Sequence, residues 1–189
     1  MFVRSYKVCK SERADQQRDK VMKLNLGCGG DLISGYLNID LHRPEKSRSG
    51  ISSDEFEFHI GDVSDLSFIP DGSCAEIRAK DILDHITYKN LALVIEEWIK
   101  KLKPNGVLLL LVVPDFQYIF DQYSSGRSHS SWLKLNQWVD RFSFPEERYR
   151  TKNIIDYEYL KMLVEGTGMA EHKHWHDDDG NVNIEFTKK

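Results

Sequence analysis

The stretch Lys23–Gly30 reads KLNLGCGG and decides the fold. It carries an apolar-rich run, Met22–Leu26, directly into a turn containing Gly27, Gly29 and Gly30. An apolar run that stops at turn residues predicts a short buried strand. Glycine allows tight turns and close backbone approach, and it leaves amide N–H groups exposed. We therefore expect a ligand-binding turn immediately after the first strand.

Two further short runs each have an aspartate at or just beyond their C-terminal end. Tyr36–Leu41 contains Asp40 near its end, and Glu57–Ile60 is followed by Asp62. The weaker run Ala75–Ala79 predicts a fourth strand. Because ligands bind outside the carboxyl ends of strands in open α/β sheets, we expect both aspartates to share one edge with the glycine turn.

The next segments predict a helix and then a strand. One helical face carries Leu91, Val94, Ile95, Trp98, Ile99 and Leu102. Pro104–Gly106 is expected to end that helix, because proline cannot continue the hydrogen-bond ladder. Val107–Val113 is apolar without alternation, which is typical of a strand covered on both faces.

The C-terminal segments predict a helix and a hairpin. Asp156 is a candidate N-cap for a helix that should end near Gly166 or Gly168. Glu171–His176 and Val182–Thr187 alternate across a polar turn, as antiparallel strands do. This element order predicts an α/β fold with a doubly wound, Rossmann-like sheet, mostly parallel, with a C-terminal antiparallel hairpin.

The three features at the expected edge suit an adenosine ligand with a polar tail. Asp40 could accept both ribose hydroxyls, and the polar side chain of Asp62 could accept a hydrogen bond from the adenine amino group. A dinucleotide fingerprint would need glycine at Leu32, and its acid would come later than Asp40. No Gly-Lys-Ser/Thr follows the glycines, so a phosphate-binding Walker loop is not supported.

The glycine stretch resembles the first motif of the class I S-adenosylmethionine-dependent methyltransferases. Four further segments are similar to the family in the same order: Tyr36–Leu41, Gly61–Val63, Asp81–Ile86 (DILDHI) and Leu102–Gly106 (LKPNG) followed by an apolar strand. The resemblance covers residues 22–114 most clearly. It implies a cofactor, S-adenosyl-L-methionine, and an enzyme that transfers its methyl group.

The resemblance also implies roles for individual residues. The cofactor-binding set is Asn25, Gly27, Cys28, Gly29, Asp40, Leu41, Asp62, Val63, Asp81 and Ile82. Many family members carry aspartate at Asn25, where it could attract the cofactor ammonium. The asparagine implies either weaker cofactor binding or compensation by Asp81. We read Cys28 as a small residue of a tight turn rather than a redox thiol.

Methyl transfer needs aligned reactants more than a dedicated catalytic residue, because the cofactor is already activated. A general base is required only where the acceptor keeps its proton until attack. His85, Asp115 and Tyr118 are candidates for that role. For His85, capping or packing is the competing interpretation.

The net charge of the chain and the absence of a nucleic-acid methylation motif indicate the class of methyl acceptor. The chain has 189 residues and a formal net charge of −4, which argues against nucleic acid as a partner. The sequence also contains no Asn-Pro-Pro-Tyr type motif, which is used for methylation of exocyclic amines of nucleic acids. We expect a small-molecule, sugar or metabolite acceptor. A non-catalytic S-adenosyl-ligand-binding protein and an aminopropyl transferase remain the alternatives.

The organisation of the chain predicts one domain over residues 22–189, preceded by a basic arm at 1–21. An aromatic-rich segment at 116–153 is expected either to wall the acceptor site or to form its own small core. No apolar run reaches the length of a membrane span, and three cysteines in no metal-binding spacing favour a reducing, cytoplasmic setting. His172, His174 and His176 alternate, but an exposed hairpin explains them better than a metal site, so no metal is predicted. The oligomeric state is not predicted.

Overall fold

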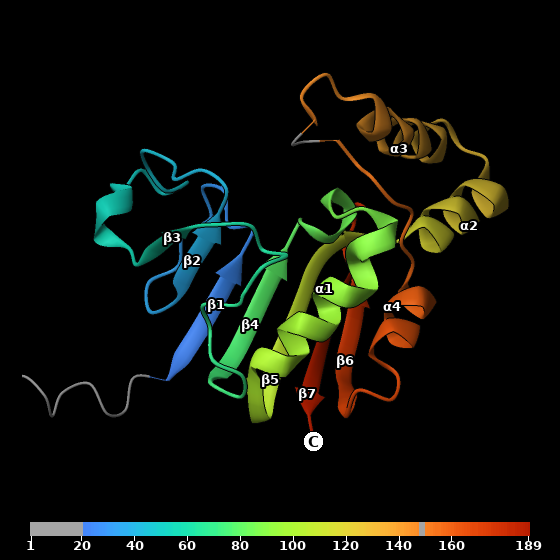
Figure 1. The fold of residues 1–189 in the computed structure, drawn as a ribbon. Coiled ribbons are helices and arrows are strands. Elements are labelled where there is room, and N and C mark those ends of the chain that lie inside the picture. The colour runs from blue at the N-terminus through green and yellow to red at the C-terminus, as the bar shows by residue number, and fades with distance from the viewer. Residues whose placement is uncertain (1–20, 148–149) are drawn as a thin grey trace, which may run out of the picture.

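The computed structural model describes residues 21–147 and 150–189. The predicted N-terminal arm therefore lies outside the described residues, except for Val21. The described chain builds one seven-stranded sheet in the order β3-β2-β1-β4-β5-β7-β6. Figure 1 shows this sheet with the helices α1 and α4 beside it and the pair α2 and α3 beyond one end.

The strands confirm the predicted mixture of pairings. The pairs among β1, β2, β3, β4 and β5 are parallel, whereas β7 is antiparallel to both β5 and β6. The bounds are β1 Met22–Leu26, β2 Leu37–Asp40, β3 Phe58–Ile60, β4 Cys74–Lys80, β5 Leu102–Pro114, β6 Met169–His176 and β7 Asn181–Lys188. The fold is therefore a Rossmann-like α/β sheet with a C-terminal antiparallel hairpin.

The strand β5 begins earlier than predicted and is unevenly covered. Leu102 already pairs with Cys74, and a register irregularity follows before Val107 pairs with Glu76. Along the strand, Leu108 and Leu110 are fully buried, while the alternate residues are half-buried. One face of β5 is thus sealed and the other only partly covered, contrary to the expected double cover.

Helix α1, Tyr88–Lys101, presents the predicted apolar face to the sheet. Leu91, Ile95 and Trp98 have no exposed surface. The helix ends at Lys101, before Pro104, and the Pro104–Gly106 turn lies within β5. The Trp98 indole Nε1 donates to the Val63 carbonyl at 2.8 Å, which fixes the loop after β3 to this helix. This hydrogen bond connects the core to the carboxyl edge of the sheet.

The connections at the first half of the sheet are loops. No α-helix lies between β1 and β4 in this part of the chain, which the structure describes throughout; the 3-10 turn η1, Ser53–Glu55, is the helical element there. The loops leave the carboxyl edge of β1, β2 and β3 open to a ligand.

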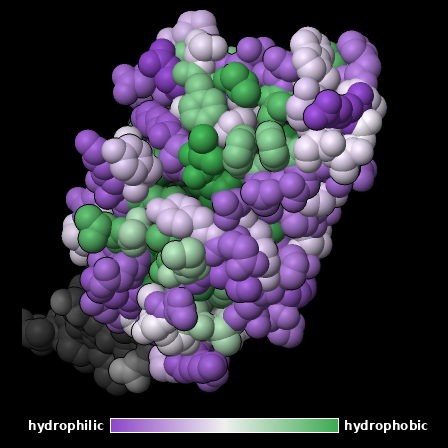
Figure 2. All heavy atoms as spheres, turned by 90° about the vertical axis from the view of Figure 1, so that its right-hand side faces the viewer, coloured by the Kyte–Doolittle hydropathy of each residue, from purple (hydrophilic) through white to green (hydrophobic). Residues whose placement is uncertain are grey.

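The segment between β5 and α4 forms a helical excursion. It comprises α2 Phe116–Gly126, α3 His129–Asp140 and the 3-10 turn η3 Arg141–Ser143. The Trp138 ring lies 5.1 Å from Phe116 and 4.9 Å from Phe142, between ring centroids. These contacts confirm the small aromatic core that the sequence offered as one interpretation. Figure 2 shows hydrophobic side chains gathered on the outer face of this region, where Phe120, Trp132 and Val139 are exposed.

The C-terminal elements follow the prediction closely. Asp156 caps α4, Tyr157–Val164, by accepting from the Tyr159 N–H at 2.8 Å. The hairpin β6–β7 closes the sheet, and a register irregularity between Glu171 and Lys173 interrupts the expected alternation of histidines in β6. Among the described residues, no helix has the length and apolar character needed to cross a membrane.

Candidate active site

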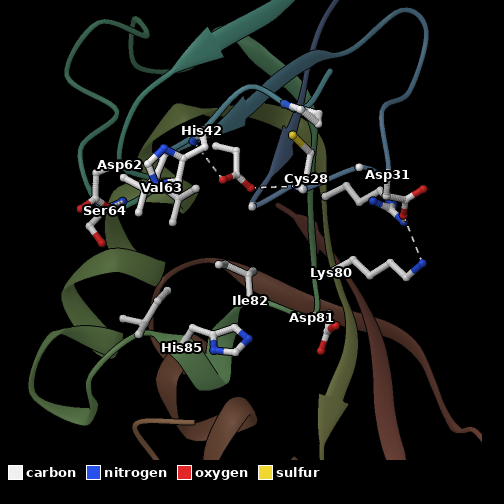
Figure 3. A pocket seen from close by; sticks show the side chains of 18 of the residues that line it. Cys28, Asp31, His42, Asp62, Val63, Ser64, Lys80, Asp81, Ile82 and His85 are labelled. Atoms are coloured by element: carbon white, nitrogen blue, oxygen red, sulfur yellow. Dashed lines mark hydrogen bonds and ion pairs between the residues drawn. The ribbon is translucent and has the colours of Figure 1, made fainter. Parts of the chain in front are cut away.

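Strands are added to one side of β1 as far as β3, and the chain then crosses back to place β4 on the other side of β1. A cavity of about 710 Å³ opens at this switch between β1 and β4. Such a switch point is where open α/β sheets bind ligands. Figure 3 shows the side chains that converge on the cavity from β1, β2, β4 and the loops that follow them. Every residue in the predicted cofactor-binding set except Asn25 lines it.

The glycine turn is held against β2 by its own amides. The Gly27 and Cys28 N–H groups donate to the Ile39 carbonyl at 2.9 and 3.3 Å, and the Gly29 N–H donates to Asp40 Oδ2 at 2.8 Å. The expectation of free amides facing a ligand is therefore wrong for these three residues. These hydrogen bonds hold the turn in place, and a ligand in the cavity would contact the surface of the turn rather than its N–H groups.

Close packing explains why glycine is required at position 27. Gly27 has a φ of +60°, and a Cβ there would lie 2.6 Å from Ile82 Cγ1. Gly29 also has a positive φ, +49°, but a Cβ there would meet nothing within 4 Å. Gly27 thus allows the turn after β1 to touch the turn after β4.

The Asp40 carboxylate is oriented by the backbone at the end of β2. Its Oδ2 accepts from the Gly29 N–H and its Oδ1 from the His42 N–H at 3.3 Å. Because carboxylate oxygens have more than one acceptor direction, Asp40 retains capacity for a ligand hydroxyl. It lines the cavity beside Leu41 and His42.

Asp62 and Val63 line the cavity from the loop after β3. Asp62 Oδ1 accepts from the Ser64 N–H at 2.8 Å, and Val63 is buried. The Trp98 hydrogen bond to the Val63 carbonyl holds this wall in place. The cavity therefore has a polar and an apolar group together on its β3 side.

Asn25 lies beneath the turn and does not line the cavity. Its side-chain amide donates to Asn38 Oδ1 at 2.9 Å and to the Asp31 carbonyl at 2.8 Å, while its Oδ1 accepts from Arg78 at 2.7 Å. An aspartate at this position could not make the two donations. The asparagine is explained by this buried network.

A charged cluster that the sequence analysis missed lies beside Asn25. The Asp31 carboxylate Oδ2 accepts from Arg78 at 3.0 Å and from Lys80 at 3.1 Å, and all three residues line the cavity. Figure 3 shows Lys80 extended toward Asp31 across the end of β4. Burial alone would raise the pKa of Asp31, but the hydrogen bonds from Lys80 and Arg78 outweigh burial and hold it below its ordinary value. The alternating basic residues at the end of the Ala75–Ala79 run were the available sequence signal.

Cys28 faces the cavity as a protonated thiol. Burial, reinforced by the nearby Asp40 charge, raises its pKa to about 12. A thiol with so high a pKa is a poor nucleophile near neutral pH. The interpretation of Cys28 as a small turn residue agrees with this environment.

The turn after β4 forms the wall opposite the glycines. Asp81, with a φ of +53°, Ile82 and His85 all line the cavity. The segment that follows α3 and η3 is hydrogen-bonded to this turn. Thr151 Oγ1 donates to Asp84 at 2.9 Å, and the Asn153 side chain donates to the Leu83 and Ile86 carbonyls. Of the described residues in 116–153, only Lys152 lines the cavity, so the segment supports this wall more than it forms it.

Asp115 and Tyr118 lie together, but not in this cavity. The Asp115 carboxylate, 3% exposed, caps α2 through the Tyr118 N–H and accepts from His176 Nε2 at 2.8 Å. The Tyr118 ring stacks on His176 at 4.1 Å between centroids and lines a second hollow of about 410 Å³. Of the three catalytic candidates, His85 is the one that lines the large cavity.

The other histidines of β6 have different surroundings. His174 Nδ1 lies 2.7 Å from Glu171 Oε1, and its ring packs against Tyr157. His176 pairs with Asp115 instead. The alternating pattern therefore does not bring these side chains to a common centre.

No protein-family model and no curated protein matches the chain. Solved structures do match its fold. An S-adenosylmethionine-dependent methyltransferase from Methanosarcina mazei superposes with a TM-score of 0.56 at 17% identity, covering 88% of this chain and 92% of that one. Another from Archaeoglobus fulgidus gives a TM-score of 0.59 at 12% identity, covering 89% and 86%. The chain has the class I methyltransferase fold.

A putative methyltransferase from Bacillus halodurans C-125 also superposes, with a TM-score of 0.58 at 12% identity over 88% of this chain and 92% of that one. At such identities the likeness concerns the methyltransferase fold alone. The function must be argued from the cavity itself.

Proposed function

We propose that the protein binds S-adenosyl-L-methionine in the large cavity and transfers its methyl group to a small-molecule, sugar or metabolite acceptor. One observation carries this proposal: the glycine turn, the Asp40 carboxylate and the Asp62–Val63 wall all line one cavity at the switch point of the sheet. Asp40 binds the ribose hydroxyls, and Asp62 with Val63 receives the adenine. Leu41 and Cys28 pack against the nucleoside between them.

The charged cluster at the other side of the glycine turn suits the methionine tail. Arg78 and Lys80 place two positive charges around the single carboxylate of Asp31. The surplus positive charge favours the tail carboxylate, while Asp31 and Asp81 favour its ammonium group. Asp31 thereby supplies the negative charge that Asn25 does not.

This cluster separates the methyl donor from the donor of an aminopropyl transferase. An aminopropyl donor has lost the tail carboxylate, so the positive charge of Arg78 and Lys80 that exceeds the single charge of Asp31 would face a cationic tail. Like charges in such contact are unfavourable. The cavity therefore favours the donor that retains its carboxylate.

Methyl transfer then depends on alignment. The sulfonium carries the activation, and the cavity walls hold donor and acceptor in line and exclude water. His85 and Asp81 lie on the acceptor side, next to Ile82. The Asp115 carboxylate already caps α2 and is hydrogen-bonded to His176. Where an acceptor must lose a proton, His85 is therefore better placed than Asp115 to act as the base.

Binding of S-adenosylhomocysteine, measured by calorimetry and by the shift in melting temperature, tests the proposed site. A ligand at about 100 times its Kd stabilises a folded protein by about 2.7 kcal/mol. Asp40→Ala should weaken binding by about 10- to 100-fold, because it removes hydrogen bonds to a charged group. Asp65→Ala, an exposed aspartate outside the cavity, is the matched control and should bind normally. A folded protein that millimolar ligand does not stabilise has no such site.

A second pair of measurements separates the alternatives. Lys80→Met should weaken S-adenosylhomocysteine but not 5′-methylthioadenosine, which lacks the amino-acid tail, and Lys23→Met, outside the cavity, is the control. Transfer of labelled methyl to a metabolite extract distinguishes an enzyme from a binding protein. Preference for the decarboxylated donor would instead support the aminopropyl alternative.

A further inference from the structure

Three side chains of metal-binding type come together directly after β4. Asp81, Asp84 and His85 each offer one ligand atom, and these atoms all lie within 4.8 Å of one another. Asp81 directly follows β4, and Asp84 and His85 belong to the 3-10 turn η2, Leu83–His85. The proposed adenosyl site uses only Asp81 and His85 from this cluster.

His85 is oriented by a backbone carbonyl. Its Nδ1 lies 3.1 Å from the Arg150 carbonyl oxygen, which can only accept, so the proton is on Nδ1. In the neutral ring this leaves a lone pair on Nε2, which lies 3.8 Å from Asp84 Oδ1, beyond hydrogen-bond reach. Metal-binding histidines are held in this way, with the other ring nitrogen donating to a carbonyl.

Asp84 contributes a buried oxygen with nothing bonded to it. The residue is 2% exposed, and its Oδ2 accepts from Thr151 Oγ1 at 2.9 Å. The Arg141 guanidinium approaches that same oxygen at 3.9 Å. Among the described atoms, Oδ1 has no hydrogen-bond partner. An unpaired buried carboxylate oxygen is costly, and a cation facing it would remove that cost.

Asp81 is the exposed member of the cluster and lies on its cavity side. Its N–H still donates to the Leu111 carbonyl at 3.0 Å, so it is anchored to the sheet, while its side chain is exposed to the cavity. Figure 3 shows Asp81 and His85 on the same side of the cavity as Ile82. An ion between them would have protein ligands on one side and open positions on the other.

We propose that Asp81, Asp84 and His85 bind a divalent cation at the acceptor side of the cavity. Two carboxylate oxygens and one imidazole nitrogen suit Mn²⁺ or Zn²⁺, and the two carboxylates balance the charge of the ion. The open positions face the place where an acceptor would lie, so an acceptor bearing oxygen ligands would be held there. The ion can bind without the adenosyl ligand, but the site shares Asp81 and His85 with the proposed function, and a His85 that ligates the ion through Nε2 would no longer act as a base.

Binding of Mn²⁺, followed by electron paramagnetic resonance and by calorimetry on the full chain, tests the site; Zn²⁺ is titrated in parallel. One ion should bind per chain. Asp81→Asn and His85→Gln should each weaken binding by about 10-fold or more. The glutamine can still donate to the Arg150 carbonyl, so loss of binding would report the missing Nε2 ligand.

Two matched variants control for surface binding. Asp65→Asn and His129→Gln change exposed residues of the same types outside the cluster and should bind Mn²⁺ as the unmodified chain does. Melting temperatures verify that each variant is folded. The proposal is overturned if millimolar Mn²⁺ and Zn²⁺ both fail to bind, or if all variants bind equally. S-Adenosylhomocysteine binding is measured on the same samples, so failure of the cation site remains distinct from failure of the adenosyl site.

Discussion

Replacing Gly27 with alanine should damage both the fold and the ligand site. A non-glycine residue in the left-handed region costs about 1–2 kcal/mol. The new methyl group would also lie 2.6, 2.7 and 2.9 Å from three carbons of Ile82, and such overpacking costs about 1–3 kcal/mol. The expected destabilisation is therefore about 2–5 kcal/mol.

The neighbouring glycine provides a matched control. Gly29→Ala meets the same backbone restriction, but its methyl group touches nothing within 4 Å, so it should cost only about 1–2 kcal/mol. Urea unfolding with an unchanged m value measures both changes. In an Ile82→Ala background two of the three close contacts disappear, and the penalty of Gly27→Ala should fall. Equal penalties for the two glycines, or no relief from Ile82→Ala, would refute the packing argument.

Three further variants and conditions test the surroundings of the cavity. The pKa of Asp31 is depressed in the folded state, so its contribution to stability is present above its unfolded pKa and is lost as the pH falls through the folded pKa. In the Asp31→Asn variant the free energy of unfolding should therefore fall less steeply with decreasing pH below about 4. Thr151→Val removes the hydrogen bond to buried Asp84 and should cost about 1.5–3 kcal/mol in urea unfolding, with Thr151→Ser near the unmodified value. Because the Cys28 pKa is about 12, iodoacetamide should modify it at pH 8 only after unfolding, as peptide mapping would detect; rapid labelling of the native protein would contradict the burial argument.

The sheet could be predicted because its signals are local. Short apolar runs, the glycines after β1 and the apolar face of α1 each follow from periodicity or turn chemistry, and their order implies the topology. The same reasoning brought Asp40 and Asp62 to one edge. Asn25 was assigned to the cofactor site through the family resemblance alone, and it lies beneath the turn instead, because a buried amide and a ligand-facing amide look alike in sequence.

The parts that could not be predicted depend on contacts between distant segments. Arg78 and Lys80 meet Asp31 only after β4 pairs with β1, 47 and 49 residues apart in the chain. Asp115 was a candidate base for the acceptor, yet its carboxylate is hydrogen-bonded to His176, 61 residues away in the chain. Strand order places residues at an edge, but side-chain partners decide which cavity they serve.

The helical excursion influences the cavity mainly through its returning end. Its aromatic side chains pack on one another around Trp138, whereas the chain at 150–153 bonds to Asp84, His85 and the carbonyls of η2. The Lys152 N–H donates to the Asp84 carbonyl at 2.7 Å, so backbone and side chains hold the same turn. A movement of α2 and α3 would therefore reach the cavity through the positions of Asp84 and His85. The excursion thus bears on the cavity wall after β4 through residues 150–153, although nearly all of its described residues lie outside the cavity.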